Sequence, residues 1–249
     1  FAMKNYILLA LAASTLSISC SKNKKDFGKD FYNTIESVDR TSSDGSTLKT
    51  TFEYDAQGHI ISTTQSFAQN GTPGTETFSY AYDGKTVTRT AGTTVTKAST
   101  DSDGRIISIV TALPDVTVTD NFSYDVSGRI TGQKGGTEVS VSWDDYNMLS
   151  NTMTLPGGIG VQSKSYTYGS EVNNCNIDMV TLLGEGLLST NGWLGFNFGK
   201  VSRNVPVKIS DGISAKTYDY TADRNGRIET INEYSGSDVQ TKYVINYKQ

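Results

Sequence analysis

Short runs of alternating apolar and polar residues, separated by glycine turns, constrain this chain more than any other feature. Clear examples are residues 78–82, 116–124, 139–143 and 243–247, where apolar or aromatic side chains recur at nearly every second position. A period of two places these side chains on one face of an extended strand and the polar ones on the other. The pattern therefore predicts an all-β chain of half-buried antiparallel strands. The turns between strands are predicted at Asp44-Gly45, Asn70-Gly71, Asp83-Gly84, Asp103-Gly104, Gly135-Gly136, Asp211-Gly212, Asn225-Gly226 and Ser235-Gly236.

A nine-residue unit repeats within this pattern. Residues 52–60 match residues 122–130 almost position by position, and both read aromatic-x-Tyr-Asp-x-x-Gly-(His/Arg)-Ile. We expect the aspartate to accept backbone amides in a turn, the glycine to adopt a left-handed conformation and the isoleucine to start the next strand. The arginine can pair with the aspartate or lie over a neighbouring aromatic ring. Such self-similarity predicts a series of stacked, near-identical hairpins. Weaker copies of the unit lie at 80–84, 101–106, 141–145 and 225–228.

The N-terminal residues 1–19 have the pattern of a secretory signal peptide. Lys4 precedes an apolar run of about 14 residues, which is shorter than the roughly 20 residues that a membrane span needs. Phe1 and Ala2 precede the first methionine, Met3, and are not part of this pattern. Cys20 follows the small residue Ser19, and this junction resembles a bacterial lipobox. The resemblance implies cleavage before Cys20 and a diacylglyceryl group on its thiol, which would anchor the protein stably in a membrane. The alternative is an ordinary secreted protein with a chance cysteine.

Residues 20–30 are polar and rich in lysine, and we expect them to form a solvated tether after the lipidated cysteine. Lysines at such a position can rest on anionic lipid head groups. The expected location is therefore the outer membrane, on either its periplasmic or its cell-surface face. The membrane, reached through the lipid anchor, is the first predicted partner.

The repeated unit resembles the YD repeat, and the chain as a whole resembles Bacteroidetes-type lipoproteins of unknown function with a porin-like fold. The resemblance extends over the lipobox, the tether, the Tyr-Asp hairpins and residues 176–178 and 202–206. It implies that residues 31–249 form a single up-and-down antiparallel meander that curls into a barrel-like sheet, for which we expect roughly 12–16 strands. It implies no activity and supplies no functional residues.

One segment, 177–198, is apolar without alternation. Met179, Leu183 and Leu187 fall at helical spacing, although Gly184 and Gly186 weaken a helix. The segment is expected to be a short plug or helical insert that covers an open end of the sheet. Two other interpretations remain, a lid over a ligand cavity and a loop that dips into lipid.

The composition excludes several classes of function. A net charge of −4, from 22 Lys and Arg against 26 Asp and Glu, provides no basic surplus for a nucleic-acid partner. One histidine and two cysteines cannot supply a structural zinc site or a Cys/His nucleophile with spare ligands. Cys175 would be the only cysteine of the folded part, so no disulfide is expected within the chain. No nucleophile elbow, phosphate loop or dinucleotide-binding glycine pattern occurs.

The polar residues that could suggest chemistry are better explained by turns. His59 occupies the arginine position of the repeat, and Asp101, Asp103, Asp144 and Asp145 lie at predicted turns without the further ligands that calcium needs. We therefore expect no catalytic residues, no metal, no cofactor and no enzymatic activity. The residues that would bind a ligand are not predicted.

Two functional hypotheses remain. In the first, the protein is an envelope-anchored binding or structural module whose aromatic and Ser/Thr-rich surfaces meet a glycan, a peptide or an envelope protein. In the second, it is a pore-like barrel or a carrier of hydrophobic ligands. Alternation alone does not say which face of a barrel is apolar. We expect the apolar face to lie inside, because threonine and aspartate interrupt it and because an integral barrel needs no separate lipid anchor.

Overall fold

A computed structural model describes residues 34–69, 71–112, 115–155, 160–185 and 195–248. The predicted signal peptide at 1–19, the lipidation site Cys20 and the tether at 20–30 lie outside the described residues. Most of the apolar segment 177–198 is described, with the exception of residues 186–194.

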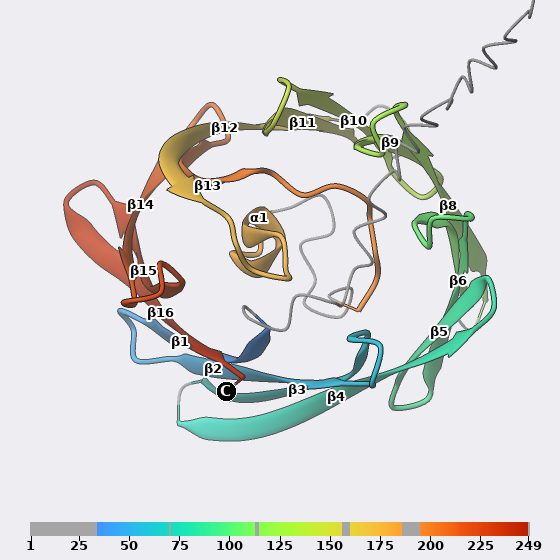
Figure 1. The fold of residues 1–249 in the computed structure, drawn as a ribbon, viewed down its shortest axis with the longest axis horizontal. Coiled ribbons are helices and arrows are strands. Elements are labelled where there is room, and N and C mark those ends of the chain that lie inside the picture. The colour runs from blue at the N-terminus through green and yellow to red at the C-terminus, as the bar shows by residue number, and fades with distance from the viewer. Residues whose placement is uncertain (1–33, 70, 113–114, 156–159, 186–194, 249) are drawn as a thin grey trace, which may run out of the picture.

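Sixteen antiparallel strands form one closed barrel (Figure 1). The strands are β1 (Ile35–Ser42), β2 (Thr47–Tyr54), β3 (Ile60–Gln69), β4 (Thr72–Asp83), β5 (Thr86–Ala91), β6 (Thr94–Thr100), β7 (Ile106–Ala112), β8 (Thr117–Tyr124), β9 (Ile130–Lys134), β10 (Glu138–Trp143), β11 (Met148–Thr154), β12 (Val161–Val172), β13 (Asn204–Ser210), β14 (Ala215–Ala222), β15 (Ile228–Ser235) and β16 (Asp238–Tyr247).

Each strand pairs with its neighbours in sequence, and β1 pairs with β16 to close the barrel. Closure is the arrangement that removes the free edges of a sheet, where unpaired backbone groups would otherwise attract other chains. The predicted all-β meander and its barrel-like curvature are thus confirmed, and the number of strands is at the upper end of the expected range.

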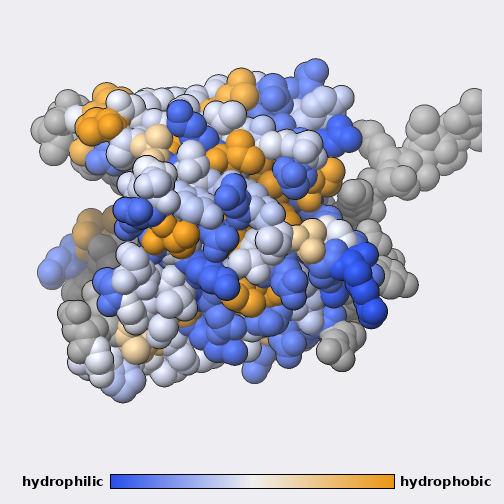
Figure 2. Space-filling model, turned by 90° about the vertical axis from the view of Figure 1, so that its left-hand side faces the viewer, coloured by the Kyte–Doolittle hydropathy of each residue, from blue (hydrophilic) through white to orange (hydrophobic). Residues whose placement is uncertain are grey.

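The apolar phase of the strands points into the barrel. In β2, Thr50 and Phe52 are buried, whereas Lys49 and Glu53 are exposed on the outside. The outer face carries mainly threonine, serine and charged residues, and the flank seen in Figure 2 is largely hydrophilic, with separate hydrophobic patches rather than a continuous belt. The buried core consists of Ile35, Val38, Phe52, Ile60, Phe78, Tyr80, Val87, Ala98, Ile106, Ile109, Phe122, Ile130, Met148, Tyr166, Val205, Ile209, Tyr218, Ile228, Ile231, Tyr243, Ile245 and further residues between β12 and β13.

The repeated unit forms the same turn in its two full copies and in two of the weaker ones. In the turn of residues 125–129, the Asp125 carboxylate accepts the backbone N–H of Ser127 at 2.9 Å and of Arg129 at 3.0 Å, and the Nε of Arg129 at 2.6 Å. Gly128 has φ +80°, a left-handed conformation that glycine adopts without strain. The turns at 55–59, 101–105 and 223–227 repeat these bonds, with His59 in the arginine position of the first.

The second aromatic residue of the unit also joins its hairpin to the preceding one. The Tyr124 hydroxyl donates to the carbonyl of Ile106 at 2.6 Å, and the Arg105 guanidinium lies 5.1 Å from the Tyr124 ring centroid. The arginine therefore does both things that the sequence left open, since it pairs with its own aspartate and lies over the next ring. Equivalent contacts with a carbonyl are Tyr54 to Ile35, Tyr82 to Ile60, Trp143 to Ile130, Tyr168 to Met148, Tyr220 to Pro206 and Tyr247 to Ile228.

These contacts lie at one end of the barrel, which we call the Tyr-Asp end. It also carries the start of β1 and the end of β16, and there Lys248 lies 4.6 Å from the Tyr54 ring centroid. We call the other end the far end; it carries the turns at residues 43–46, 211–214 and 236–237.

The segment between β12 and β13, residues 173–203, turns back into the barrel, and its described parts lie within the ring of strands (Figure 1). We call it the lumen segment. It contains α1 (Met179–Leu182), a single turn whose N-cap Asp178 accepts the backbone N–H of Thr181 at 2.9 Å. Ile177, Met179, Val180, Leu183 and Phe196 of this segment belong to the buried core.

Of the three interpretations of residues 177–198, the plug therefore describes this segment best. The helix is shorter than the spacing to Leu187 suggested, because Gly184 has φ +73° and ends the turn. Leu187 itself lies outside the described residues. In the described part of the chain, no helix has the length and apolarity to cross a bilayer.

Candidate functional site

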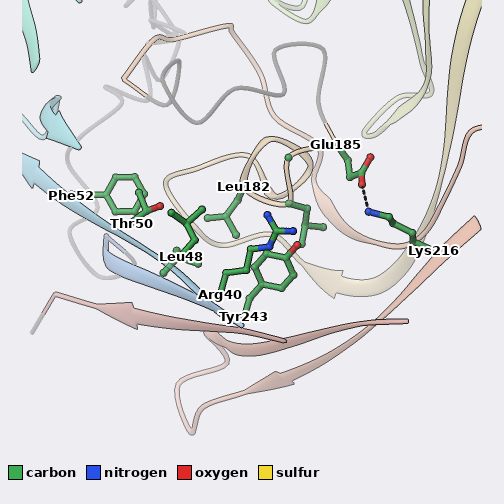
Figure 3. Close-up of a pocket in the computed structure, with 11 residues that line it drawn as sticks. Arg40, Leu48, Thr50, Phe52, Leu182, Glu185, Lys216 and Tyr243 are labelled. Atoms are coloured by element: carbon green, nitrogen blue, oxygen red, sulfur yellow. Dashed lines mark hydrogen bonds and ion pairs between the residues drawn. The ribbon is translucent and has the colours of Figure 1, made fainter. Parts of the chain in front are cut away.

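The candidate site is a cavity of about 220 Å³ between the lumen segment and the barrel wall, on the side of the far end (Figure 3). The wall contributes side chains from β1, β2, β14 and β16, and the lumen segment contributes residues 182–185. The lining residues are Val38, Arg40, Leu48, Thr50, Phe52, Leu182, Leu183, Gly184, Glu185, Lys216 and Tyr243.

Charged side chains reach this cavity because they occupy inward positions of the strands. Arg40 follows the buried Val38 by two residues, Lys216 precedes the buried Tyr218 by two, and Glu233 follows the buried Ile231 by two. A step of two keeps a residue on the same face of a strand, so all three point inward. The interior of the barrel is thus polar and charged in this region, while it is mainly apolar elsewhere.

Glu185 ties the lumen segment to two strands of the wall. One carboxylate oxygen lies 2.5 Å from the Lys164 ammonium of β12 and the other lies 2.8 Å from the Lys216 ammonium of β14. Lys216 also lies 3.2 Å from Glu233. The backbone carbonyl of Glu185 accepts the hydroxyl of the buried Tyr166 at 2.9 Å. The side chain of Glu185 is therefore fully engaged by the wall.

Burial alone would raise the pKa of the Glu185 carboxyl, but the hydrogen bonds from Lys164 and Lys216 outweigh it and hold this pKa below its ordinary value. For Lys216, burial favours the neutral amine, yet the contacts with Glu185 and Glu233 raise its pKa above the ordinary value. Both groups are therefore charged at neutral pH, and each stabilises the charged form of the other.

Arg40 is the cation of the cavity that is not engaged in this way. Its guanidinium carbon lies 5.9 Å from the Tyr243 ring centroid, and no carboxylate of the described residues lies within ion-pair distance of it. The Tyr243 hydroxyl in turn donates to Glu233 at 3.3 Å. Burial and the neighbouring Glu233 raise the pKa of Tyr243, so it remains a neutral phenol. In Figure 3, Arg40 extends along Tyr243 towards Leu182.

The cavity therefore combines an uncommitted guanidinium with apolar walls. Arg40, Lys164 and Lys216 give three positive charges, and Glu185 and Glu233 give two negative ones, which leaves a net charge of +1 around the cavity. Leu48, Phe52 and residues 182–183 form its apolar surface. Among the described residues, no group of three His, Cys, Asp or Glu side chains could hold a metal ion. The arrangement is suited to binding.

The polar residues singled out in the sequence lie elsewhere. His59 stacks on Tyr82 with ring centroids 4.7 Å apart and contacts Asp55, and Asp101 and Asp103 both pair with Arg105. Asp144 accepts backbone amides in the turn between β10 and β11, next to Asp145. Cys175 is mostly buried beside the Tyr247 hydroxyl, at 3.1 Å, and burial raises the pKa of its thiol to about 11.

Sequence reasoning did not find the residues of the cavity. The signal that could have found them is a charged residue in the apolar phase of a strand, as at Arg40, Lys216 and Glu233. Alternation judged by the apolar residues alone does not reveal it. Which of these residues meet depends on strand pairing around the barrel, because Arg40 and Lys216 are far apart in the sequence.

The ion pairs of Glu185 predict a pH-dependent contribution to stability. Glu185→Gln is expected to lower the free energy of unfolding by about 1 kcal/mol at neutral pH, a value reduced by the partial exposure of both lysines. Because folding lowers the pKa of Glu185, its stabilisation is fully present above the ordinary glutamate pKa of 4.5 and is lost as the pH falls through the folded-state pKa. Urea unfolding at neutral pH and at about pH 3.5 should show the difference from the wild type shrink.

Glu229→Gln is the matched control for this prediction, since Glu229 is exposed on β15 and has no ion pair with a described residue. It should leave the free energy of unfolding nearly unchanged at both pH values. A deficit in Glu185→Gln that stays constant down to the acidic pH would contradict the predicted linkage.

The fold itself is found in a known protein. A crystal structure of a porin-like protein from Bacteroides uniformis superposes with a TM-score of 0.71 at 16% sequence identity, covering 86% of this chain and 98% of that one. No family model and no curated protein matches the sequence. The similarity at this level of identity shows a shared porin-like β-barrel architecture for the chain.

Proposed function

We propose that this protein is an envelope lipoprotein that acts as a binding module, with its lumen closed by its own chain and a ligand site beside the lumen segment. The observation that carries the proposal is the attachment of this segment to the wall. Glu185 joins it to β12 and β14, and Asn176 accepts the backbone N–H of Ile35 in β1 at 3.0 Å. On the opposite side, Ile106 of β7 donates to the carbonyl of Asn197 at 2.8 Å. A segment bonded to the wall on several sides in this way favours a lumen that is blocked by the chain itself.

The outer surface supports an anchored barrel that stands in water. A barrel that spans the outer membrane needs an outward apolar band about 25 Å tall. Here Lys49 and Glu53 point outward from β2, and Lys242 points outward from β16, on the other side of β1. Large apolar side chains such as Leu149 and Val110 are exposed in separate patches. In this proposal Cys20 carries the lipid that holds the protein at the outer membrane, on its periplasmic or cell-surface face.

The second candidate is a pore-like barrel or a carrier of hydrophobic ligands. The porin-like architecture favours it, because barrels of this size can enclose a channel. The buried Met179 and Val180 count against it, since they fill the interior with side chains of the chain itself. The binding proposal assigns no catalytic residue, metal or cofactor. Its partners are a small ligand in the cavity and, on the outer surface, a glycan, a peptide or an envelope protein, with no role for nucleic acid.

Two measurements on the full-length protein in detergent test the proposal. In planar bilayers we expect no stepwise conductance, whereas a general porin in the same preparation conducts. In thermal unfolding with a panel of small carboxylates, phosphate esters, saccharides and short peptides, we expect at least one class to raise Tm in a concentration-dependent manner. Stepwise conductance, or no stabilisation by any class at millimolar concentrations, would overturn it.

A further inference from the structure

We propose that the cavity beside the lumen segment binds a small organic monoanion, with its carboxylate or equivalent group on Arg40 and its hydrocarbon part on the apolar wall. This inference rests on the proposed binding function and names the ligand class of the same site. Four properties of the cavity lead to it: its charge, the geometry of Arg40, its apolar surface and its size.

The charge balance selects an anion. Both oxygens of the Glu185 carboxylate are engaged by lysines, and Glu233 contacts Lys216 and the Tyr243 hydroxyl. The two carboxylates are therefore satisfied and offer little to a cation. Arg40 is the one charge of the lining without an ion pair to a described residue, and the carboxylate that feels its charge, Asp44, lies in the exposed turn between β1 and β2. An anionic ligand would neutralise the remaining positive charge, whereas a cationic one would add to it.

Arg40 is also placed to act as a fork for a planar acidic group. A guanidinium presents paired N–H donors that match the two oxygens of a carboxylate. The guanidinium carbon of Arg40 lies over the Tyr243 ring, 5.9 Å from its centroid, and a cation–π contact of this kind does not use the N–H donors. Tyr243 is itself buried, and its hydroxyl donates to Glu233, so the ring that Arg40 contacts is held in one position.

The rest of the cavity is suited to a hydrocarbon group. Leu48 and Phe52 come from β2, and Leu182, the last residue of α1, lies opposite β2 in Figure 3. Leu183, which follows α1, also lines the cavity. Phe52 and Leu183 are almost fully buried, whereas Leu48 and Leu182 keep part of their surface exposed, and an aryl or alkyl group would cover that part. Each methylene buried there is worth about 0.8 kcal/mol.

The size of the cavity limits the ligand to a small molecule. Its volume of about 220 Å³ exceeds the roughly 150 Å³ of an apolar cavity that holds benzene, but it is below the lower end of about 300 Å³ for drug-sized ligands. A phenyl or short alkyl chain with one acidic group fits this range. An oligosaccharide or a peptide segment is too large to enter.

The test compares three probes by isothermal titration calorimetry with the full-length protein in detergent: 3-phenylpropionate, its neutral analogue 3-phenylpropan-1-ol, and acetate. We expect 3-phenylpropionate to bind about tenfold or more tightly than the alcohol, because only the acid pairs with Arg40. Acetate should bind too weakly to measure at millimolar concentration, because it lacks the apolar group. Increasing the salt concentration should weaken the binding of the acid more than that of the alcohol.

Variants of Arg40 identify the residue responsible. Arg40→Gln should remove the preference for the acid and leave the affinity for the alcohol unchanged, and Arg40→Lys should restore part of it, since lysine keeps the charge without the fork. Arg224→Gln is the matched control, because Arg224 is exposed in the turn between β14 and β15 at the Tyr-Asp end. It should leave the affinities for the acid and the alcohol unchanged. Arg40 is itself exposed to the cavity, so these variants are expected to keep the Tm of the wild type.

The outcomes separate this inference from the proposed function. Equal affinities for the acid and the alcohol, or a preference for the acid that survives in Arg40→Gln, would overturn the anionic ligand class. Stabilisation by a neutral saccharide alone would also overturn it, while the proposed binding function would stand. Stepwise conductance in bilayers would refute the proposed blocked lumen, whatever the affinities measured for the three probes.

Discussion

Replacing Ile177 by alanine is expected to lower the free energy of unfolding by about 2–5 kcal/mol, as for other large-to-small substitutions in packed cores. Ile177 lies in the lumen segment with 5% of its surface exposed, and it belongs to the same buried cluster as the inward residues of the wall. The lumen segment therefore contributes core packing to the barrel as well as closing it. Urea unfolding followed by near-UV circular dichroism measures the change.

Ile213→Ala provides the same substitution without the packing, since Ile213 is 98% exposed in the turn between β13 and β14. It should change the free energy of unfolding by less than about 0.5 kcal/mol. If the two variants were equally stable, the lumen segment would not be packed against the wall. The main evidence for a lumen blocked by the chain itself would then be contradicted.

The second large effect is expected at the Tyr-Asp end. Tyr124→Phe removes the hydroxyl that donates to the Ile106 carbonyl at 2.6 Å and leaves the ring in place. Losing one partner of such a bond typically costs about 1–3 kcal/mol, because the remaining carbonyl is left without its donor. Burial raises the pKa of Tyr124, so the hydroxyl is protonated and can donate throughout the neutral range. The same urea experiment measures the loss.

Tyr146→Phe removes the same atom from a tyrosine that is 57% exposed and whose hydroxyl has no hydrogen bond to a described residue. Its free energy of unfolding should stay close to that of the wild type. A Tyr124→Phe variant as stable as this control would mean that the link between hairpins is formed by the Arg105 contact rather than by the hydroxyl.

Local features of this fold could be predicted because short-range chemistry determines them. Asp125, Gly128 and Arg129 lie within five residues, and the turn that they form needs no distant partner. The inward direction of Phe122 likewise follows from alternation, once the apolar face is assigned to the interior. For these elements the sequence pattern and the final structure agree in detail.

Contacts between distant parts of the chain could not be predicted in the same way. The pairing of β1 with β16 joins Val38 to Ile245, and alternation says nothing about which strand a given strand will meet. The Tyr124 hydroxyl, at the end of β8, reaches the carbonyl of Ile106 at the start of the adjacent strand β7, and this contact depends on the register and twist of the sheet. The cavity depends on both, since Arg40 and Glu185 come together only after the barrel has closed around the lumen segment.

The aromatic link between consecutive hairpins means that the barrel is built in steps of two strands. Duplication of one Tyr-Asp unit would add a hairpin with its own link to the previous carbonyl, and the circumference would grow by about 10 Å, twice the spacing between strands. The wall could take up the added hairpin with the contacts that it already uses. The lumen segment could not keep its attachment at its present length, because Glu185 must still reach both Lys164 and Lys216. In relatives with a different number of hairpins, the length of this inner segment should therefore vary together with the width of the wall.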